Sequence, residues 1–182
     1  TQIIVSKYGL KIFDVEQIKT HGGSLRVYLC HESSKRKVNI RVKQFLEKEK
    51  KYGLFKISTY GKFQKKVKKI QTNLYNFLIK MKKNKKVVVA YGAAAKGNTL
   101  LNSIGISKEL IKFVCDDAKS KQGKYMPGSL IPIVNKKKLS ILKPDIILIL
   151  PWNISKEVAL SLKYTKKWKT KFYVAVPNLK EV

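Results

Sequence analysis

Beyond Asn84 the sequence alternates between short apolar runs and helical patterns, and this alternation constrains the fold more than any other feature. The run IILIL at residues 146–150 contains no polar residue. A strand that is apolar on both faces is typical of a parallel sheet covered by helices on two sides. We therefore predict an α/β fold with a doubly wound, mostly parallel, Rossmann-like sheet. The predicted strands are residues 87–91, 111–115, 146–150 and 172–176, with a shorter one near 130–133, and the predicted helices are residues 98–103, 136–142 and 155–165.

The first half of the chain has a different organisation. Two strand patterns, residues 8–18 and 24–31, are joined by the turn sequence THGG. A strand pair is marginally stable by itself, so we expect residues 1–34 to be the end of a domain whose larger part lies upstream. Two helical patterns follow at residues 38–52 and 60–82, with apolar residues three and four positions apart and lysines on the opposite face.

The glycine and hydroxyl residues between the two helical patterns are read as helix boundaries. Gly53 is expected to end the first helix, and Ser58-Thr59 to cap the second. The expected organisation is therefore a strand pair at 1–34, a helical connector at 35–84 and a Rossmann-like domain at 85–182.

The net charge of +29 comes from 40 basic and 11 acidic residues. A charge of this size suggests a basic nucleic-acid-binding protein as one alternative. Only three basic residues are arginine, however, and the lysines occur in every segment without interleaved aromatic residues. Proteins that read or stack on bases favour arginine and aromatic side chains. We therefore expect no nucleic-acid partner, and the positive charge is expected to help attract an anionic substrate.

Other residue classes narrow the function further. No run of 18 apolar residues occurs, so a membrane partner is not expected. Cys30 and Cys115 lack the CxxC spacing of a metal or redox site, and the chain has two histidines. This usage predicts free thiols in a cytoplasmic protein and no metal site in this chain.

The sequence GAAAKGN at residues 92–98 joins a predicted strand to a predicted helix. It is neither a GxGxxG fingerprint nor a Walker A loop. Small residues let the backbone approach a phosphate at the start of a helix, where Lys96 would add a charge and Asn98 and Thr99 would add hydrogen bonds. A tight turn packed with alanines is an equally good interpretation.

Further candidates follow the ends of other predicted strands, where ligands bind in doubly wound sheets. Asp116-Asp117 would hold a ribose or stabilise a turn, and Trp152-Asn153 would line a pocket or form an aromatic wedge. The Gly- and Pro-containing loop at 121–133 carries Tyr125, which would wall a site or only cross the sheet. An isolated histidine, His21, lies in the THGG turn; such residues are more often structural than catalytic. These residues alone do not make a complete catalytic site.

Four segments resemble the carboxyl-terminal part of the sugar C-methyltransferase family. They are THGGSLRVY, YGAAAKGNTLLN, DDAKSKQGKYMPGSLIPI and KPDIILILPWN, in family order. The resemblance implies transfer of a methyl group from S-adenosylmethionine to C3 of a nucleotide-linked 4-keto-deoxysugar. It also implies that the catalytic base, most of the S-adenosylmethionine site and a zinc-binding cysteine-rich segment lie upstream of Thr1. By itself this fragment is expected to be inactive, and its first strands resemble the last ones of a methyltransferase domain.

The same resemblance suggests roles for particular residues in holding a nucleotide-diphosphate sugar, most simply a dTDP-sugar. The pyrophosphate or nucleotide would contact Lys96, Gly97, Asn98 and Thr99. Phosphate or sugar would contact Ser24 and Arg26, and the pocket wall would include Tyr125, Trp152 and Asn153. His21 would lie near the cleft without being the base. A stand-alone, non-catalytic nucleotide-binding module of the Rossmann type is the alternative. The second alanine of GAAAKG, often proline in relatives, is a mild departure that affects loop stiffness.

Overall fold

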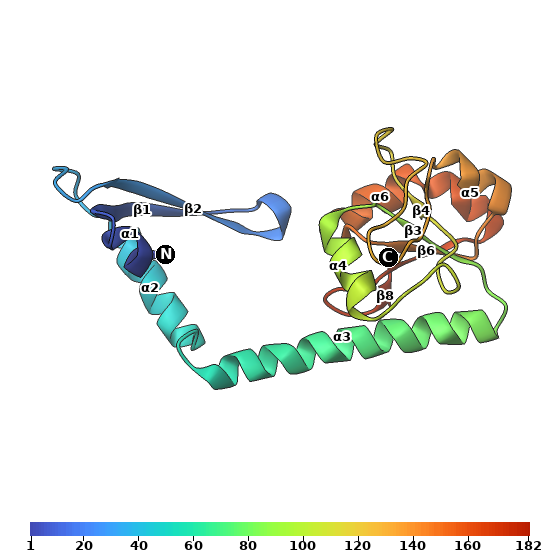
Figure 1. Cartoon of the computed structure of the whole chain (residues 1–182), viewed down its shortest axis with the longest axis horizontal. Coiled ribbons are helices and arrows are strands. Elements are labelled where there is room, and N and C mark those ends of the chain that lie inside the picture. Colours follow the sequence, from blue (N-terminus) through green and yellow to red (C-terminus); the bar gives the residue numbers. More distant parts are fainter. The chain divides into compact units, whose positions relative to one another are not determined.

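The computed structural model describes residues 1–182, apart from the side chain of His21. The chain separates into two compact units, Thr1–Gln64 and Lys65–Val182. Figure 1 shows the elements of each unit in chain order. The expected boundaries after residues 34 and 84 stay predictions.

The first unit is built on an antiparallel strand pair. Helix α1 (Gln2–Ser6), which the sequence did not predict, precedes β1 (Leu10–Ile18), and a 3₁₀ turn, η1 (Thr20–Gly22), leads to β2 (Ser24–His31). The predicted strand pair is thus confirmed. Its register places Glu16 directly opposite Arg26.

Two helices follow the strand pair. Helix α2 (Ile40–Tyr52) ends at Gly53, whose φ of 81° is the left-handed conformation that favours glycine, so this predicted boundary is confirmed. Helix α3 (Ile57–Lys83) begins earlier than predicted, and Ser58-Thr59 lie inside its first turn. The capping role was therefore wrong: the Thr59 hydroxyl instead donates to the Gly53 carbonyl at 2.8 Å.

The second unit contains a six-stranded sheet with the order β5-β4-β3-β6-β7-β8. The first five strands are parallel and β8 is antiparallel to β7. The strands are β3 (Val88–Tyr91), β4 (Val114–Cys115), β5 (Ile133–Val134), β6 (Ile146–Ile149), β7 (Lys171–Val174) and β8 (Lys180–Glu181). The helical elements of this unit after α3 are α4 (Ala95–Ser103), α5 (Lys137–Leu142), η2 (Trp152–Ile154), α6 (Ser155–Ser161) and η3 (Lys163–Trp168). The mostly parallel α/β fold is confirmed.

Two apolar clusters show that the sheet is covered on both faces. One cluster joins Leu74 and Leu78 of α3 and Leu101 of α4 to alternate strand residues such as Val88 and Ala90. The other cluster joins Leu139 of α5, Val158 of α6 and Leu162 directly after α6 to the intervening strand positions. These strand positions include Val89 and Tyr91 of β3. Side chains on a strand alternate between its faces, so this division confirms a doubly wound arrangement.

Some predicted elements are shorter or divided in the structure. In the run at 111–115 every residue except Lys112 is buried, but only Val114 and Cys115 form the strand. The helix predicted at 155–165 divides into α6 and the 3₁₀ segment η3. Within η3 the buried Thr165 hydroxyl donates to the Leu162 carbonyl, three residues earlier, at 2.9 Å.

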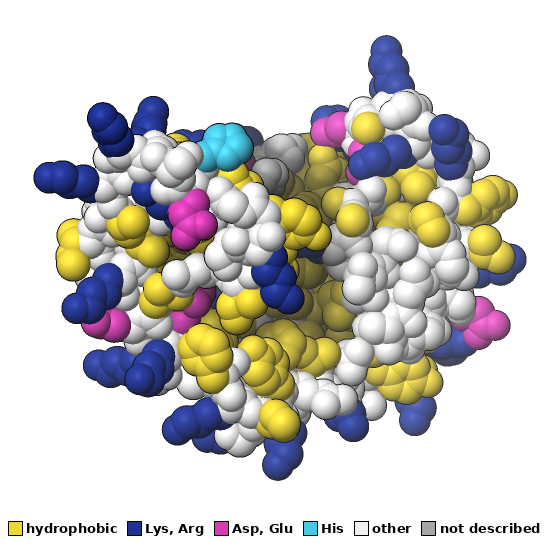
Figure 2. Space-filling model, turned by 60° about the vertical axis from the view of Figure 1, so that its left-hand side comes forward, with side chains coloured by type: hydrophobic (Ala, Val, Ile, Leu, Met, Phe, Trp, Pro, Cys, Tyr) yellow, Lys and Arg dark blue, Asp and Glu magenta, His cyan; other side chains and the backbone are white. Residues whose placement is uncertain are grey.

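The basic side chains are dispersed over the surface. Figure 2 shows Lys and Arg side chains around the whole visible face instead of in one patch. Within the described part of the chain, none of the helices is long and apolar enough to span a bilayer.

Helix α3 offers a test of how its apolar stripe is used. Leu78 is fully buried against the sheet, whereas Phe63 on the same helix is 66% exposed. We expect Leu78→Ala to lower the free energy of unfolding by about 2–5 kcal/mol, because it leaves a cavity. Phe63→Ala should change it by only about 0.5 kcal/mol. Urea unfolding followed by circular dichroism measures both, and equal losses would contradict the assignment of the core.

Candidate functional site

The turn after β3 is packed tightly against the segment that follows β6. Gly92 has a φ of 94°, and a Cβ added to it would lie 2.5 Å from Cδ of Pro151. A Cβ on Gly97 would lie 2.6 Å from Cβ of Leu150. Both distances are too short for any side chain, so close packing explains the two glycines of GAAAKGN. A contact between Gly97 and a phosphate stays a prediction.

A carboxylate and a lysine hold the same turn from the side of β4. Asp116 accepts hydrogen bonds from the backbone N–H of Ala93 at 2.7 Å and of Ala118 at 2.9 Å. Lys121 Nζ donates to the Ala93 carbonyl at 2.9 Å and lies 3.4 Å from the Asp116 carboxylate. Both the backbone N–H and the backbone carbonyl of Ala93 are thus hydrogen-bonded by side chains. Of the two roles considered for Asp116, the structure shows the one that stabilises a turn.

The neighbouring Asp117 is also engaged within the chain. Its carboxylate accepts a hydrogen bond from the Tyr91 hydroxyl at 2.8 Å and pairs with Lys136 at 3.1 Å. Partial burial favours the neutral carboxyl, but the hydrogen bonds from Tyr91 and Lys136 outweigh it and lower the pKa of Asp117. Burial, followed by the bond to Asp117, raises the pKa of Tyr91. Tyr91 therefore stays a neutral hydrogen-bond donor.

A pocket of about 550 Å³ opens between the start of α4 and the loop that follows β4. This volume is typical of small-molecule sites. Its apolar wall consists of Ala93, Ala94, Ala95, Met126, Pro127 and Ile133. Its polar groups come from Asn98, Ser120, Lys121, Lys124 and Tyr125. None of the described side chains that line it is a carboxylate.

Two features make this pocket suitable for an anion. Helix α4 begins at Ala95, and the methyl group of the preceding Ala94 cannot cap its first turn. Backbone N–H groups and the helix dipole favour negative charge at such an end. Lys124 adds positive charge across the pocket, and Lys121 lines it while paired with Asp116.

Asn98 is the unusual polar residue of the pocket. Its Oδ1 atom is buried and has no hydrogen-bond partner in the described part of the protein. Buried polar atoms are nearly always paired, so this atom is an exception among the residues that line the pocket.

The structure divides the other predicted site residues of the second unit. Asn98 and Tyr125 line the pocket. Lys96 lies elsewhere, with its Nζ 5.9 Å from the centre of the Trp152 ring, within the range of a cation–π contact. Thr99 is exposed and its hydroxyl donates to the Ala95 carbonyl at 3.0 Å, while Asn153 is exposed in η2.

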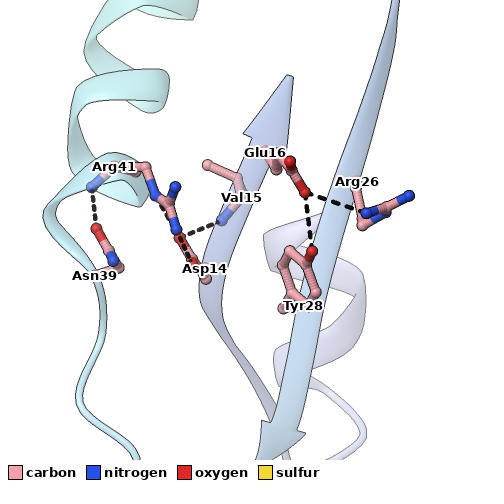
Figure 3. Close-up of polar contacts among 7 residues, drawn as sticks. All are labelled: Asp14, Val15, Glu16, Arg26, Tyr28, Asn39 and Arg41. Carbon is pink, nitrogen blue, oxygen red and sulfur yellow. Dashed lines mark hydrogen bonds and ion pairs between the residues drawn. The ribbon is translucent and has the colours of Figure 1, made fainter. Parts of the chain in front are cut away.

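Ser24 and Arg26 belong to the first unit, where both have partners within the strand pair. Ser24 Oγ donates to the Thr20 carbonyl at 3.1 Å. Figure 3 shows Arg26 and Tyr28 of β2 directed at the same carboxylate oxygen of Glu16, at 3.2 and 2.9 Å. Arg26 is therefore held in place by its cross-strand neighbour. The side chain of His21 lies outside the described residues.

A second ion pair of the first unit joins β1 to α2. Arg41 binds both carboxylate oxygens of Asp14, one of them through its Nε at 3.0 Å (Figure 3). The hydrogen bond from Arg41 lowers the pKa of Asp14 despite some desolvation. This bidentate pair ties the amino-terminal end of α2 to the strand.

The cysteines and carboxylates provide no metal centre. Within the described side chains, no group of three or more His, Cys, Asp or Glu residues is placed to hold a metal ion. Cys30 and Cys115 are free thiols, as predicted, and burial raises the pKa of Cys115 to about 12, so it stays protonated. The zinc expectation concerns a segment outside this chain and remains an expectation.

The sequence reasoning missed Ser120, Lys121 and Lys124. In a chain with 40 basic residues, two lysines of a loop look like any others. Two signals of an ordered loop were available in the sequence. The lysines follow Asp116 closely, and Gly123 lies between them.

The surroundings of two helical glycines, Gly97 in α4 and Gly61 in α3, predict opposite effects of substitution by alanine on stability. Gly97→Ala should destabilise the protein by about 1–3 kcal/mol, because its Cβ meets Leu150. Gly61→Ala in α3 should stabilise it by about 0.5–1 kcal/mol, because no described atom lies within 4 Å of the added methyl group. Thermal unfolding of the two variants checks this. A higher melting temperature for both variants would mean that α4 does not pack against Leu150, the residue after β6.

Comparison with known proteins agrees with this arrangement. The family described as "C-methyltransferase C-terminal domain" matches residues 19–177. C-methyltransferase NovU of Streptomyces niveus is 29% identical over 175 residues, which cover 96% of this chain and 42% of that protein. The chain thus spans less than half the length of this relative. The family match includes strand β2, helices α2 and α3, and strands β3 to β7 of the sheet beside the pocket, and the chain belongs to the family of C-methyltransferase carboxyl-terminal domains.

Proposed function

We propose that this chain binds and positions the nucleotide-linked keto-deoxysugar of an S-adenosylmethionine-dependent C-methyltransferase. The observation that carries the proposal is the pocket at the start of α4, which combines helix N–H groups, two lysines and an apolar wall without a carboxylate among its described lining residues. A nucleoside diphosphate has matching parts: a charged diphosphate and a flat, weakly polar base. A dTDP-sugar is the proposed ligand.

The chemistry of such a substrate explains why a positioning domain is useful. A ketone at C4 makes the C3 proton acidic, so a base can remove it only if C3 is held at the correct place. Fixing the distant diphosphate end restricts the translation and rotation of the reacting sugar. The residues of this chain contribute that restriction, and the base is proposed to lie elsewhere in the enzyme.

S-adenosylmethionine, which would supply the methyl group, is proposed to bind mostly outside this chain. In a Rossmann unit an acidic residue at this strand end holds a ribose hydroxyl. Here Asp116 is occupied by backbone N–H groups and Lys121, and Asp117 by Tyr91 and Lys136. We therefore assign no role to this chain's residues in binding the methyl donor.

Calorimetric titration of the 182-residue chain tests the proposal. We expect dTDP to bind and S-adenosylmethionine not to bind. Lys124→Ala should weaken dTDP binding about five- to tenfold, since it removes one charged contact worth about 1–1.5 kcal/mol. Lys96→Ala tests whether the nucleotide also reaches Trp152.

The matched control is Lys68→Ala, which removes the same charge from the exposed face of α3. A nucleotide attracted only by the overall charge would respond equally to Lys68→Ala and Lys124→Ala. That result, or the absence of any dTDP binding, would contradict the proposal.

A further inference from the structure

We infer that Asp116 and Lys121 are positioning residues of the pocket at the start of α4: they hold the backbone of Ala93 and thereby set the direction in which the first N–H groups of α4 point. The inference rests on the proposed function and adds to it how the site is kept in shape. Asp116 is 9% exposed and is not among the described residues that line the pocket. Its effect on a ligand must therefore pass through the groups that it binds.

Ala93 lies two residues before α4, and side chains hold both of its backbone polar groups. Asp116 accepts a hydrogen bond from its N–H at 2.7 Å, and Lys121 Nζ donates to its carbonyl at 2.9 Å. The N–H of the next residue, Ala94, donates to the Gly92 carbonyl at 2.9 Å. A rotation of this turn would break these bonds, so the start of α4 is held in one direction.

The two positioning residues are themselves fixed to the edge of the sheet. Asp116 directly follows β4, and its second carboxylate oxygen accepts from the N–H of Ala118 at 2.9 Å. Gln122, next to Lys121, donates through Nε2 to the backbone carbonyl of Asp116 at 2.9 Å. Asn135, which follows β5, donates in turn to Oε1 of Gln122 at 3.1 Å. The carboxylate and the lysine are thus in place without a ligand.

A fixed direction matters because the first N–H groups of a helix have no partners inside the helix. Donors that are already aligned bind an anion without the entropic cost of ordering them. Lys121 contributes to this alignment with an ammonium group that is engaged by Ala93 and Asp116. Lys124 is the lysine that we propose to contact the ligand, so the two lysines of the pocket have different roles.

Charge and geometry predict opposite effects of one substitution, Asp116→Asn. The carboxylate is negative and lies near a pocket proposed to take an anion, so its removal should strengthen binding on electrostatics alone. Asp116 uses both carboxylate oxygens, one for Ala93 and one for Ala118. Asparagine has a single accepting oxygen, so one of these N–H groups would lose its partner. The positioning role therefore predicts weaker binding.

Calorimetric titration with dTDP distinguishes the two effects. We expect Asp116→Asn to weaken binding about five- to twentyfold. The matched control is Asp145→Asn, because Asp145 also accepts a backbone N–H, that of Val87 at 2.8 Å, and pairs with Lys86 at 2.8 Å. Asp145 precedes β6, at the opposite end of the strands from the pocket. Its substitution should change dTDP binding by no more than about twofold.

A double variant gives a second comparison. Asp116→Asn and Lys121→Met together leave the net charge unchanged, so a purely electrostatic role predicts binding close to that of the unaltered chain. On the positioning role both bonds to Ala93 are lost, and the double variant stays at least as weak as Asp116→Asn. The two losses should not add, because both substitutions release the same residue.

Circular dichroism and the urea midpoint report whether each variant is folded. If Asp116→Asn does not fold, Lys121→Met decides, with Lys119→Met as its control, because Lys119 is exposed in the same loop and does not line the pocket. Lys121→Met should weaken dTDP binding about three- to tenfold more than Lys119→Met does.

Three results would overturn the inference and leave the proposed function intact. They are equal or tighter binding of dTDP by Asp116→Asn, equal losses in the two aspartate variants, and equal losses in the two lysine variants. Failure of the unaltered chain to bind dTDP would overturn both.

Discussion

The contact between the turn after β3 and the segment after β6 fixes where helix α4 begins. Gly92 and Gly97 bring the backbone against Pro151 and Leu150 with no space for a side chain. On the other side, Asp116 binds the N–H of Ala93. The turn is thus held between the ends of β6 and β4, the two strands that flank β3 in the sheet. Because α4 follows at once, the direction of its first N–H groups is set by packing and needs no ligand.

This constraint also explains why the pocket lies off the usual position. In doubly wound sheets ligands bind where the strand order reverses, here between β3 and β6. The glycine contacts bring the chain together at that point, and Lys96 lies over Trp152 beside it. The pocket opens instead on the side of β4, between the start of α4 and residues 120–127 of the loop that follows β4. The packing of Gly92 and Gly97 thus fills the space between the ends of β3 and β6, and the pocket lies beside it on the side of β4.

The sequence predicted the sheet well because burial on both faces leaves a strong signal, as in IILIL at 146–150. It did not predict β8, since Lys180 and Glu181 are polar and pair with β7 only in the folded chain. Ser58-Thr59 had the right chemistry for a cap, but α3 begins before them at Ile57.

The candidate site was only partly readable. Asn98 and Tyr125 stood out, whereas the lysines of the pocket did not. For Asp116, a carboxylate that binds a backbone N–H and one that binds a ribose occur at the same spacing, so only three-dimensional contacts distinguish them. The family match supports the resemblance drawn from four motifs, and it does not assign roles to single residues.

The large positive charge limits what electrostatics can contribute to selectivity. The 40 basic residues of the chain raise the local concentration of every anion, whichever base or sugar it carries. Salt screens this attraction beyond about 10 Å at 0.1 M ionic strength, while hydrogen bonds inside a pocket are much less affected. On the proposed function, selection among anionic ligands would therefore depend on short-range, uncharged groups of the pocket, such as the side chains of Asn98 and Tyr125.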